Sequence, residues 1–334
     1  MSEVISTAGL RQLAGDWLSQ GKRVVGPRQV KPELVLYEPL VNGEQLLLGG
    51  FVRPSNSIKE FVFPRHESVY AYLFQGKELD LVDAEVPFRE QVLLAARPCD
   101  AAALPILDPL FNWDYEDEFY NTRRRTTTIV SLACLAHDDA CFCTSVGLGP
   151  AETRGSDAIL LPSGDGQFAV QSMTEKGQAL FSGHTRGSAA EPTIPPGPKK
   201  KFEPGHVQTF LREQFESSFW QEQTLRCLGC GACAYTCPTC HCFDIVDEGN
   251  ATGGIRAKNW DSCQFPMFTL HASGHNPRSV QAQRQRQRLL HKFLVYPEKF
   301  GEILCTGCGN CTRNCPVSLG VLSVLEALGT GQSI

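Results

Sequence analysis

The residues in this chain best suited to chemistry are cysteines, of which there are fifteen. Two runs share one spacing: Cys227-x2-Cys230-x2-Cys233-x3-Cys237-Pro238 and Cys305-x2-Cys308-x2-Cys311-x3-Cys315-Pro316. Three cysteines at every third residue wrap a loop around one iron–sulfur cubane, and the fourth reaches the second cubane of a pair. The proline after it fits a first helical turn, where its missing N–H costs no hydrogen bond.

The two runs therefore predict two [4Fe–4S] clusters with crossed ligands. Cluster I takes Cys227, Cys230, Cys233 and Cys315, and cluster II takes Cys305, Cys308, Cys311 and Cys237. Glycines inside both runs let backbone amides approach the sulfur atoms, and these hydrogen bonds tune the reduction potential. The alternative is a pair of zinc sites, but zinc sites seldom show the full run with its proline, and here it occurs twice.

Four more cysteines lie in the first half of the chain: Cys99, Cys134, Cys141 and Cys143. Cys99 follows the apolar run Gln91–Ala96, and Cys134 follows Thr127–Ala133; both runs are typical of strands buried on both faces. If those strands are parallel neighbours, both thiols lie at the carboxyl edge of a sheet, where α/β proteins bind ligands. The four thiols could hold a third [4Fe–4S] cluster, cluster III, or could be small buried apolar side chains.

The last three cysteines, Cys240, Cys242 and Cys263, are one short of a complete site. They are either packed structural thiols or ligands in a mixed set, and the sequence leaves both interpretations open. We expect the histidines nearby to be packing residues or to support ligands rather than to bind metal. The arginines between Arg278 and Arg288 are expected on a solvated helix face, with docking of an acidic partner or neutralisation of cluster charge as the alternative.

The elements around these cysteines predict an α/β N-terminal domain over residues 1–182. Helices are expected near the N-terminus (Leu10 to Leu18), from Ala101, and at Glu175–Phe181, with further strands at Arg23–Val25 and Ala158–Leu161. Residues 183–205, rich in Gly, Pro, Ser and Lys, are interpreted as a linker. Residues 206–334 are expected to form an α-helical, ferredoxin-like dicluster domain, with helices at Val207–Gln223 and Ser279–Leu294. The 67 residues from Pro238 to Leu304 form a large insertion between its two motifs.

Composition excludes several classes of protein. The net charge of −5 gives no basic face for nucleic acid. No stretch approaches the roughly 18 apolar residues of a membrane span, and the first residues lack the layout of a signal peptide. We therefore expect a cytoplasmic protein, in which cysteines serve as metal ligands rather than disulfides. No catalytic residue and no binding residue for an organic cofactor is assigned, since no triad, carboxylate pair or GxGxxG loop stands out.

Four segments resemble a known family: RPCDAAAL (Arg97–Leu104), CFCTSVGLGP (Cys141–Pro150), CLGCGACAYTCPTCHCFDI (Cys227–Ile245) and WDSCQFPMFTLHASGHNPR (Trp260–Arg278). They resemble the beta subunit of cytoplasmic NAD(P)-linked nickel–iron hydrogenases of the sulfhydrogenase type and, less closely, an iron–sulfur subunit of anaerobic sulfite reductase. The resemblance runs from about Arg97 to the C-terminus. It implies an electron-relay subunit between a flavin and [2Fe–2S] subunit that handles NAD(P)H and a catalytic subunit.

Three functions are consistent with these features. The first is an electron-transfer subunit of a soluble, multisubunit hydrogenase-type complex, without bond-making chemistry of its own. The same relay in an anaerobic sulfite reductase or a heterodisulfide-reductase-linked complex is its nearest alternative. The second is a free-standing iron–sulfur reductase with a substrate pocket in the α/β domain, which a stable monomer that oxidises NADH would favour. The third is a redox or iron sensor, which would normally carry a DNA-binding or signalling module.

Overall fold

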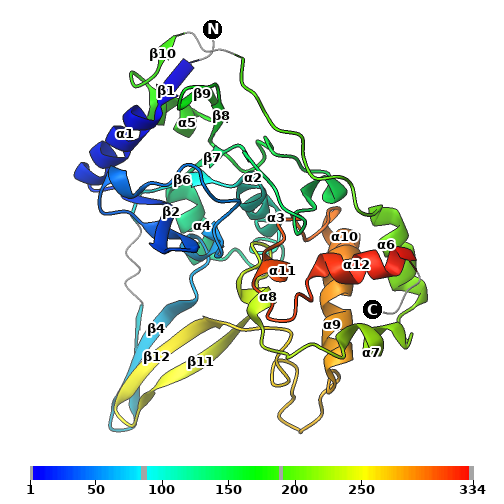
Figure 1. Cartoon of the computed structure of the whole chain (residues 1–334). Helices are drawn as coiled ribbons and strands as arrows, with labels where there is room; N and C mark the ends of the chain where they lie inside the picture. Colours follow the sequence, from blue (N-terminus) through cyan, green and yellow to red (C-terminus); the bar gives the residue numbers. More distant parts are fainter. Residues whose placement is uncertain (1–2, 84–88, 188–190, 331–334) are drawn as a thin grey trace.

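The computed structural model describes residues 3–83, 89–187 and 191–330 of the chain. Its N-terminal part is built on an eight-stranded sheet in the order β10-β1-β9-β8-β7-β6-β2-β3, shown in Figure 1. The four central strands, β2, β6, β7 and β8, are parallel, and the outer strands pair antiparallel. The bounds are β1 (Glu3–Ser6), β2 (Arg23–Lys31), β3 (Leu34–Pro39), β6 (Gln91–Ala96), β7 (Thr127–Leu132), β8 (Ala158–Pro162), β9 (Gln167–Ser172) and β10 (Arg186–Gly187).

Helices pack on both faces of this sheet and bury two apolar clusters. Helix α1 places Leu10, Leu13 and Trp17 against one face at helical spacing, and the Ser6 hydroxyl caps it by accepting a bond from the Gly9 amide. The helices of this part are α1 (Thr7–Ser19), α2 (Pro98–Ala101), α3 (Ala103–Leu107), α4 (Glu118–Thr126) and α5 (Glu175–Phe181), with 3-10 turns η1 (Gly43–Gln45), η2 (Ile58–Phe61) and η3 (Cys143–Val146). The parallel pair β6–β7 joined by α2 to α4 confirms the expected βαβ unit.

A second, four-stranded antiparallel sheet projects from the body as an arm, at the lower left of Figure 1. Its order is β11-β12-β4-β5, with bounds β4 (His66–Gln75), β5 (Glu78–Asp83), β11 (Phe243–Asn250) and β12 (Gly253–Trp260). Strand β12, from the insertion between the two cysteine motifs, pairs with β4 from the first half of the chain. The second sheet therefore contains strands from both sides of the linker expected at residues 183–205.

The C-terminal part is mainly helical and has its own apolar cluster, which includes Leu289, Phe293 and Val324. Its helices are α6 (Pro204–Glu213), α7 (Phe219–Thr224), α8 (Ala232–Tyr235), α9 (Gln281–Leu290), α10 (Tyr296–Phe300), α11 (Asn310–Arg313) and α12 (Val321–Thr330), with a π-helical turn η4 (His291–Val295). The single helix expected at Val207–Gln223 is wrong: α6 ends at Glu213 and α7 begins at Phe219. The Trp220 indole donates to the Gln214 carbonyl oxygen at 2.8 Å and so satisfies one of the groups left free at the end of α6.

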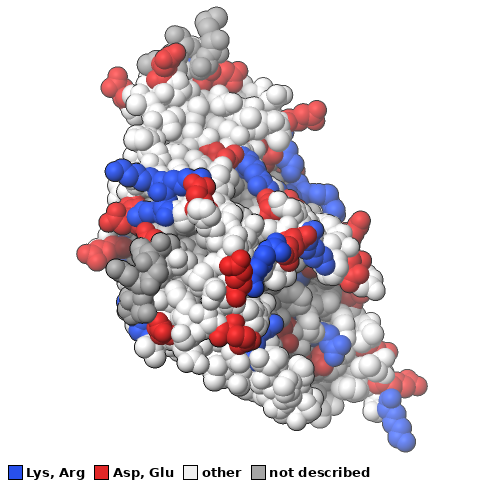
Figure 2. Space-filling model, turned by 90° about the vertical axis from the view of Figure 1, so that its right-hand side faces the viewer, with Lys and Arg blue, Asp and Glu red and all other residues white. Residues whose placement is uncertain are grey.

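No helix in the described part of the chain is long and apolar enough to cross a bilayer. Figure 2 shows basic and acidic side chains interspersed across the middle of one face of the molecule.

Candidate metal centres

Cys237 of the first motif and Cys305, Cys308 and Cys311 of the second motif line one cavity. All four thiols are buried, although Cys237 lies 68 residues before Cys305 in the sequence. About 280 Å³ around them is free of protein atoms, part of it open to solvent. These are the four residues that the spacing assigns to cluster II.

Two buried cations stand beside this cavity. The Lys292 ammonium lies 3.4 Å from Cys237 Sγ and donates to Thr239 Oγ1 and to the Leu304 carbonyl oxygen, each at 3.0 Å. Arg288 also lines the cavity, and its Nη2 donates to the Cys233 carbonyl oxygen at 3.3 Å. A hydrogen bond from the Cys240 thiol and the nearby Lys292 charge lower the pKa of Cys237. A lowered pKa favours the thiolate, which is the form that binds iron.

Cys99, Cys134, Cys141 and Cys143 line a second cavity. Cys99 lies in α2 directly after β6, Cys134 follows β7, and the other two flank Phe142 in the next loop. The free space there is about 510 Å³, part of it open to solvent. Prolines of the segment after β10 help to line it: Pro195, Pro196 and Pro198. The structure therefore brings together all four residues that the sequence proposes for cluster III.

Two arginines connect the second cavity to the first. Arg53 Nη1 lies 3.2 Å from Cys99 Sγ and 3.4 Å from the Cys308 carbonyl oxygen. Arg313 makes the corresponding pair of contacts, with Nη2 2.9 Å from Cys141 Sγ and Nη1 2.7 Å from the same carbonyl oxygen. Each guanidinium also pairs with a carboxylate, Asp100 for Arg53 and Asp138 for Arg313. Cys308 itself lines both cavities, so the two sites are neighbours.

Glycine is required where the second motif docks on the Cys141–Cys143 loop. Gly307 and Gly309 have φ angles of 63° and 76°, which favour glycine. A Cβ on Gly307 would lie 2.5 Å from the Cys143 backbone, and one on Gly309 would lie 2.4 Å from the Ala140 carbonyl oxygen. The Phe142 amide donates to the Gly307 carbonyl oxygen at 2.8 Å. This close backbone packing fixes the separation of the two cavities.

The site expected for cluster I is closer to the surface. Cys230 is exposed, whereas Cys227, Cys233 and Cys315 are half-buried and pack on the C-terminal apolar cluster. Gln281 Nε2 lies 3.4 Å from Cys227 Sγ, and the Leu319 amide donates to Cys315 Sγ at 3.2 Å. The charge of Arg288 acts on Cys233 as well as on Cys237 and Cys311, so this arginine lies between the two ferredoxin-type sites.

The thiols that line the two cavities fit a bound [4Fe–4S] cubane. Burial raises the pKa of Cys305 and Cys143 to about 12 and that of Cys308 to about 11, so these thiols would stay protonated at neutral pH without metal. Iron supplies the positive charge that offsets this cost and displaces the protons. Within the described ranges, no three His, Cys, Asp or Glu side chains converge as a site for a single metal ion.

Buried arginine N–H groups without hydrogen-bond partners also support a bound cluster in each cavity. In the described structure, Nε and Nη1 of both Arg97 and Arg288 are buried without a hydrogen-bond partner, and one of these arginines lines each cavity. Buried cationic groups need a counter-charge, which a cubane with four thiolate ligands would provide.

The remaining cysteines lie beside the clusters' expected ligands. The Cys240 thiol forms a hydrogen bond with Cys237, and the Cys242 thiol forms one with Cys263, which also lies close to Cys233; all of these cysteines are free thiols. His241 and His291 have ring centres 5.2 Å apart, and burial lowers their pKa values to about 3 and about 4, which suits neutral packing groups. Sequence reasoning missed the cations Arg53 and Lys292, and also Lys59, whose buried ammonium donates to the Cys240 carbonyl oxygen at 2.7 Å. It was wrong to place Arg284 and Arg288 on a solvated face by default, because both are buried.

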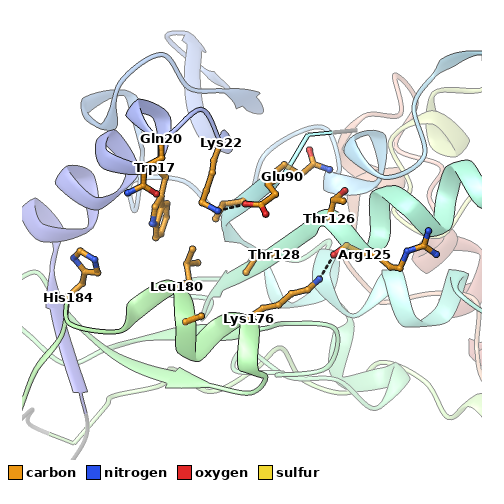
Figure 3. A pocket seen from close by; sticks show the side chains of 13 residues that line it. Trp17, Gln20, Lys22, Glu90, Arg125, Thr126, Thr128, Lys176, Leu180 and His184 are labelled. Atoms are coloured by element: carbon orange, nitrogen blue, oxygen red, sulfur yellow. Dashed lines mark hydrogen bonds and ion pairs between the residues drawn. The ribbon is translucent and has the colours of Figure 1, made fainter. Parts of the chain in front are cut away.

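A groove at the opposite, amino end of β6 and β7 is separate from the cysteines (Figure 3). Trp17, Lys22, Lys176 and His184 line it. Lys22 pairs with Glu90, and Lys176 donates to the carbonyl oxygens of Arg125 and Thr127 at 2.6 and 3.1 Å. The two lysines thus already have partners within the fold.

Comparison with known proteins gives two matches. Residues 226–319, which hold both cysteine motifs, match the family model of the 4Fe–4S dicluster domain. The chain is also 30% identical, over 285 residues covering 82% of each chain, to sulfhydrogenase 2 subunit beta of Pyrococcus furiosus. No solved structure matches the chain.

Proposed function

The chain belongs to the family of sulfhydrogenase beta subunits, and from that premise we propose that it relays single electrons through three [4Fe–4S] clusters between two partner subunits. As an iron–sulfur subunit of this type it has an electron-transfer role in an oxidoreductase complex. Each cubane supplies one site that accepts and returns a single electron.

The observation that carries the proposal is the sharing of residues between neighbouring sites. Cys308 lines both the cluster II cavity and the cavity of the four N-terminal cysteines. Arg288 acts on Cys233 of cluster I and on Cys237 and Cys311 of cluster II. The proposed order along the relay is therefore cluster I, cluster II, cluster III.

The protein's own part in this relay is to hold the clusters and to set their charge environment. Cys227, Cys230, Cys233 and Cys315 would hold cluster I; Cys305, Cys308, Cys311 and Cys237 cluster II; and Cys99, Cys134, Cys141 and Cys143 cluster III. Hydrogen bonds and positive charge near the sulfur atoms raise the potential of a cluster. Arg53, Arg313 and Lys292 are placed to do this, since each lies within 3.4 Å of a ligand sulfur.

The family supports the following choice of partners. One would be a flavin and [2Fe–2S] subunit that exchanges electrons with NAD(P)H, and the other a catalytic subunit of hydrogenase type, all in the cytoplasm. The same relay in an anaerobic sulfite reductase or a heterodisulfide-reductase-linked complex would differ only in the subunit that accepts the electrons. A free-standing reductase would need its own substrate pocket. The Figure 3 groove does not favour this alternative, because Lys22 and Lys176, which line it, already pair with groups of the fold.

Iron and acid-labile sulfide analysis of the anaerobically purified protein tests the cluster count. We expect about twelve irons per chain, four for each cubane. The Cys134→Ser variant should hold about eight and keep the spectroscopic signals of clusters I and II. A wild-type value near eight would contradict cluster III.

Affinity purification from the native host, without oxygen, tests the relay itself. A nickel–iron subunit together with a flavoprotein would support the hydrogenase-type complex. A sirohaem protein or heterodisulfide-reductase-like subunits would keep the relay and change the acceptor. A chain that purifies alone and oxidises NADH would overturn the relay.

A further inference from the structure

The surface around Cys230 combines an exposed cluster ligand with exposed apolar side chains. Of the fifteen cysteines, all of which lie in the described ranges, Cys230 is the one that is exposed. Leu225 and Leu228, on either side of Cys227, are 85% and 68% exposed, and Met267 in the insertion is 69% exposed. Leu270 and Val280 extend the same set.

Contacts place these two segments next to each other. Gln281, which directly follows Val280, reaches Cys227 Sγ and also donates to Gln264 Oε1 at 2.9 Å. A Cβ on Gly231 would lie 2.6 Å from the Phe265 ring, so the insertion packs directly on the first cysteine motif. The exposed apolar side chains therefore lie on adjoining segments beside the cluster I cysteines. We call this set the Cys230 surface: Leu225, Leu228, Met267, Leu270 and Val280 with Cys230.

Basic side chains predominate on these segments. Residues 224–233 and 262–281 contain Arg226, Arg278 and two exposed histidines, His271 and His275, and the nearest acidic residues in the sequence, Glu222 and Asp261, lie just outside them. The chain as a whole carries a net charge of −5, so this surface differs from the average of the molecule. A partner with an apolar centre and acidic groups around it would match it.

We propose that the Cys230 surface is where a partner subunit with its own flavin or iron–sulfur centre docks, through an apolar patch rimmed by acidic residues. This assignment rests on the proposed relay, because an electron must pass between cluster I and a centre on another chain. Contiguous exposed apolar patches mark interaction sites. Burial of this patch under a partner would also exclude water from Cys230 and bring the second centre close to cluster I.

A second copy of this chain fits the surface less well. In a two-fold dimer the same patch meets itself, so Arg226 and Arg278 would face the arginines of the other copy. Like charges across an interface oppose association. The positive rim therefore favours a different, acidic subunit.

The test compares two matched substitutions in the tagged chain, expressed in the native host and purified without oxygen. Met267→Glu places a negative charge in the Cys230 surface, and Leu81→Glu makes the same change at a 63% exposed position on β5 of the arm. For each variant we would measure iron content, reduction of cluster I by dithionite, and the amount of the co-purifying flavin- or cluster-bearing subunit. Dithionite is a small reductant and needs no docked partner.

We expect Met267→Glu to keep its iron and its dithionite-reducible cluster I but to lose about tenfold or more of the redox subunit, a change that corresponds to about 1.4 kcal/mol. Leu81→Glu should behave as wild type. Arg278→Glu should weaken the same association and make it less dependent on salt, which keeps the test decisive if Met267→Glu fails to fold.

Retention of the redox subunit by both Met267→Glu and Arg278→Glu would overturn the docking site while leaving the relay intact. Self-association of the wild type that Met267→Glu abolishes would show a second copy as the occupant, and would also overturn it. If the wild-type chain brings down no redox subunit at all, the proposed relay itself fails.

Discussion

The ferredoxin-type site at Cys230 and the buried sites around Cys308 differ in how the fold surrounds them. Cys230 is exposed among apolar side chains, whereas Cys237, Cys305, Cys308 and Cys311 are buried beside Lys292, Arg288 and Arg53. A buried anionic cluster needs positive charge from the protein, while a cluster at the surface is also screened by water. The difference fits the proposed relay, in which the buried cluster II site passes electrons within the chain and the exposed site at Cys230 exchanges them with another chain.

The largest effect is expected from Cys237→Ser, which tests whether the buried site draws a ligand from the first motif. Iron should fall from about twelve to about eight, and electron flow through the chain should stop, because the middle cluster is lost. The signal of cluster I should persist. Cys240→Ser is the control and should leave both ferredoxin-type clusters assembled. Electron paramagnetic resonance distinguishes the signals of the two clusters. Loss of the cluster I signal with the cluster II signal intact would refute the crossed ligation.

Removal of a buried cation should be the next largest effect. Arg53→Met leaves Asp100 buried and uncompensated, and breaking such a pair typically costs about 3–5 kcal/mol. The urea midpoint of the iron-loaded protein should fall accordingly. The double variant Arg53→Met with Asp100→Asn should recover part of this loss. Arg256→Met, which breaks the exposed pair with Asp247, should not measurably change the midpoint.

A smaller effect is expected on a reduction potential. Arg313→Gln removes the positive charge 2.9 Å from Cys141 Sγ, and an added electron is then less well stabilised. The potential of cluster III should become more negative by about 59 mV or more, a tenfold change in a one-electron equilibrium. A redox titration followed by electron paramagnetic resonance measures this. Arg212→Gln, at an exposed pair with Glu298, should leave all potentials unchanged; an equal shift in both variants would argue against a local effect.

The smallest effect concerns pH. Burial lowers the pKa of His291 to about 4, against about 6.5 in the unfolded chain. The unfolded state therefore binds more protons between these values, so stability is lost as pH falls below about 6.5. Between pH 7.5 and 5.5 this group should cost about 1 kcal/mol. His291→Asn should reduce the pH dependence of the urea midpoint by that amount, and an unchanged slope would contradict the assignment.

Strands with buried faces were predictable from local pattern. Gln91–Ala96 is buried at all six positions and was identified as a strand from its aliphatic run. The arm was not predicted, because β11 is exposed along nearly its whole length and carries Asp244, Asp247 and Glu248 without regular alternation. Its pairing partner β12 meets β4 about 190 residues earlier in the chain, as in the pair Asn259 with His66, and local sequence does not encode such a contact.

The two ferredoxin-type motifs and the family could be recognised without a structure, because a cubane is ligated mainly by one short loop whose cysteine spacing can be read directly. The sequence also placed Cys99 and Cys134 after neighbouring strands, since a βαβ unit aligns the ends of its strands. The folded structure was needed to show which cations lie beside the thiols, that Arg288 is buried, and that Cys230 is exposed. Burial and charge compensation depend on residues far apart in the chain, which meet only when the whole fold has formed.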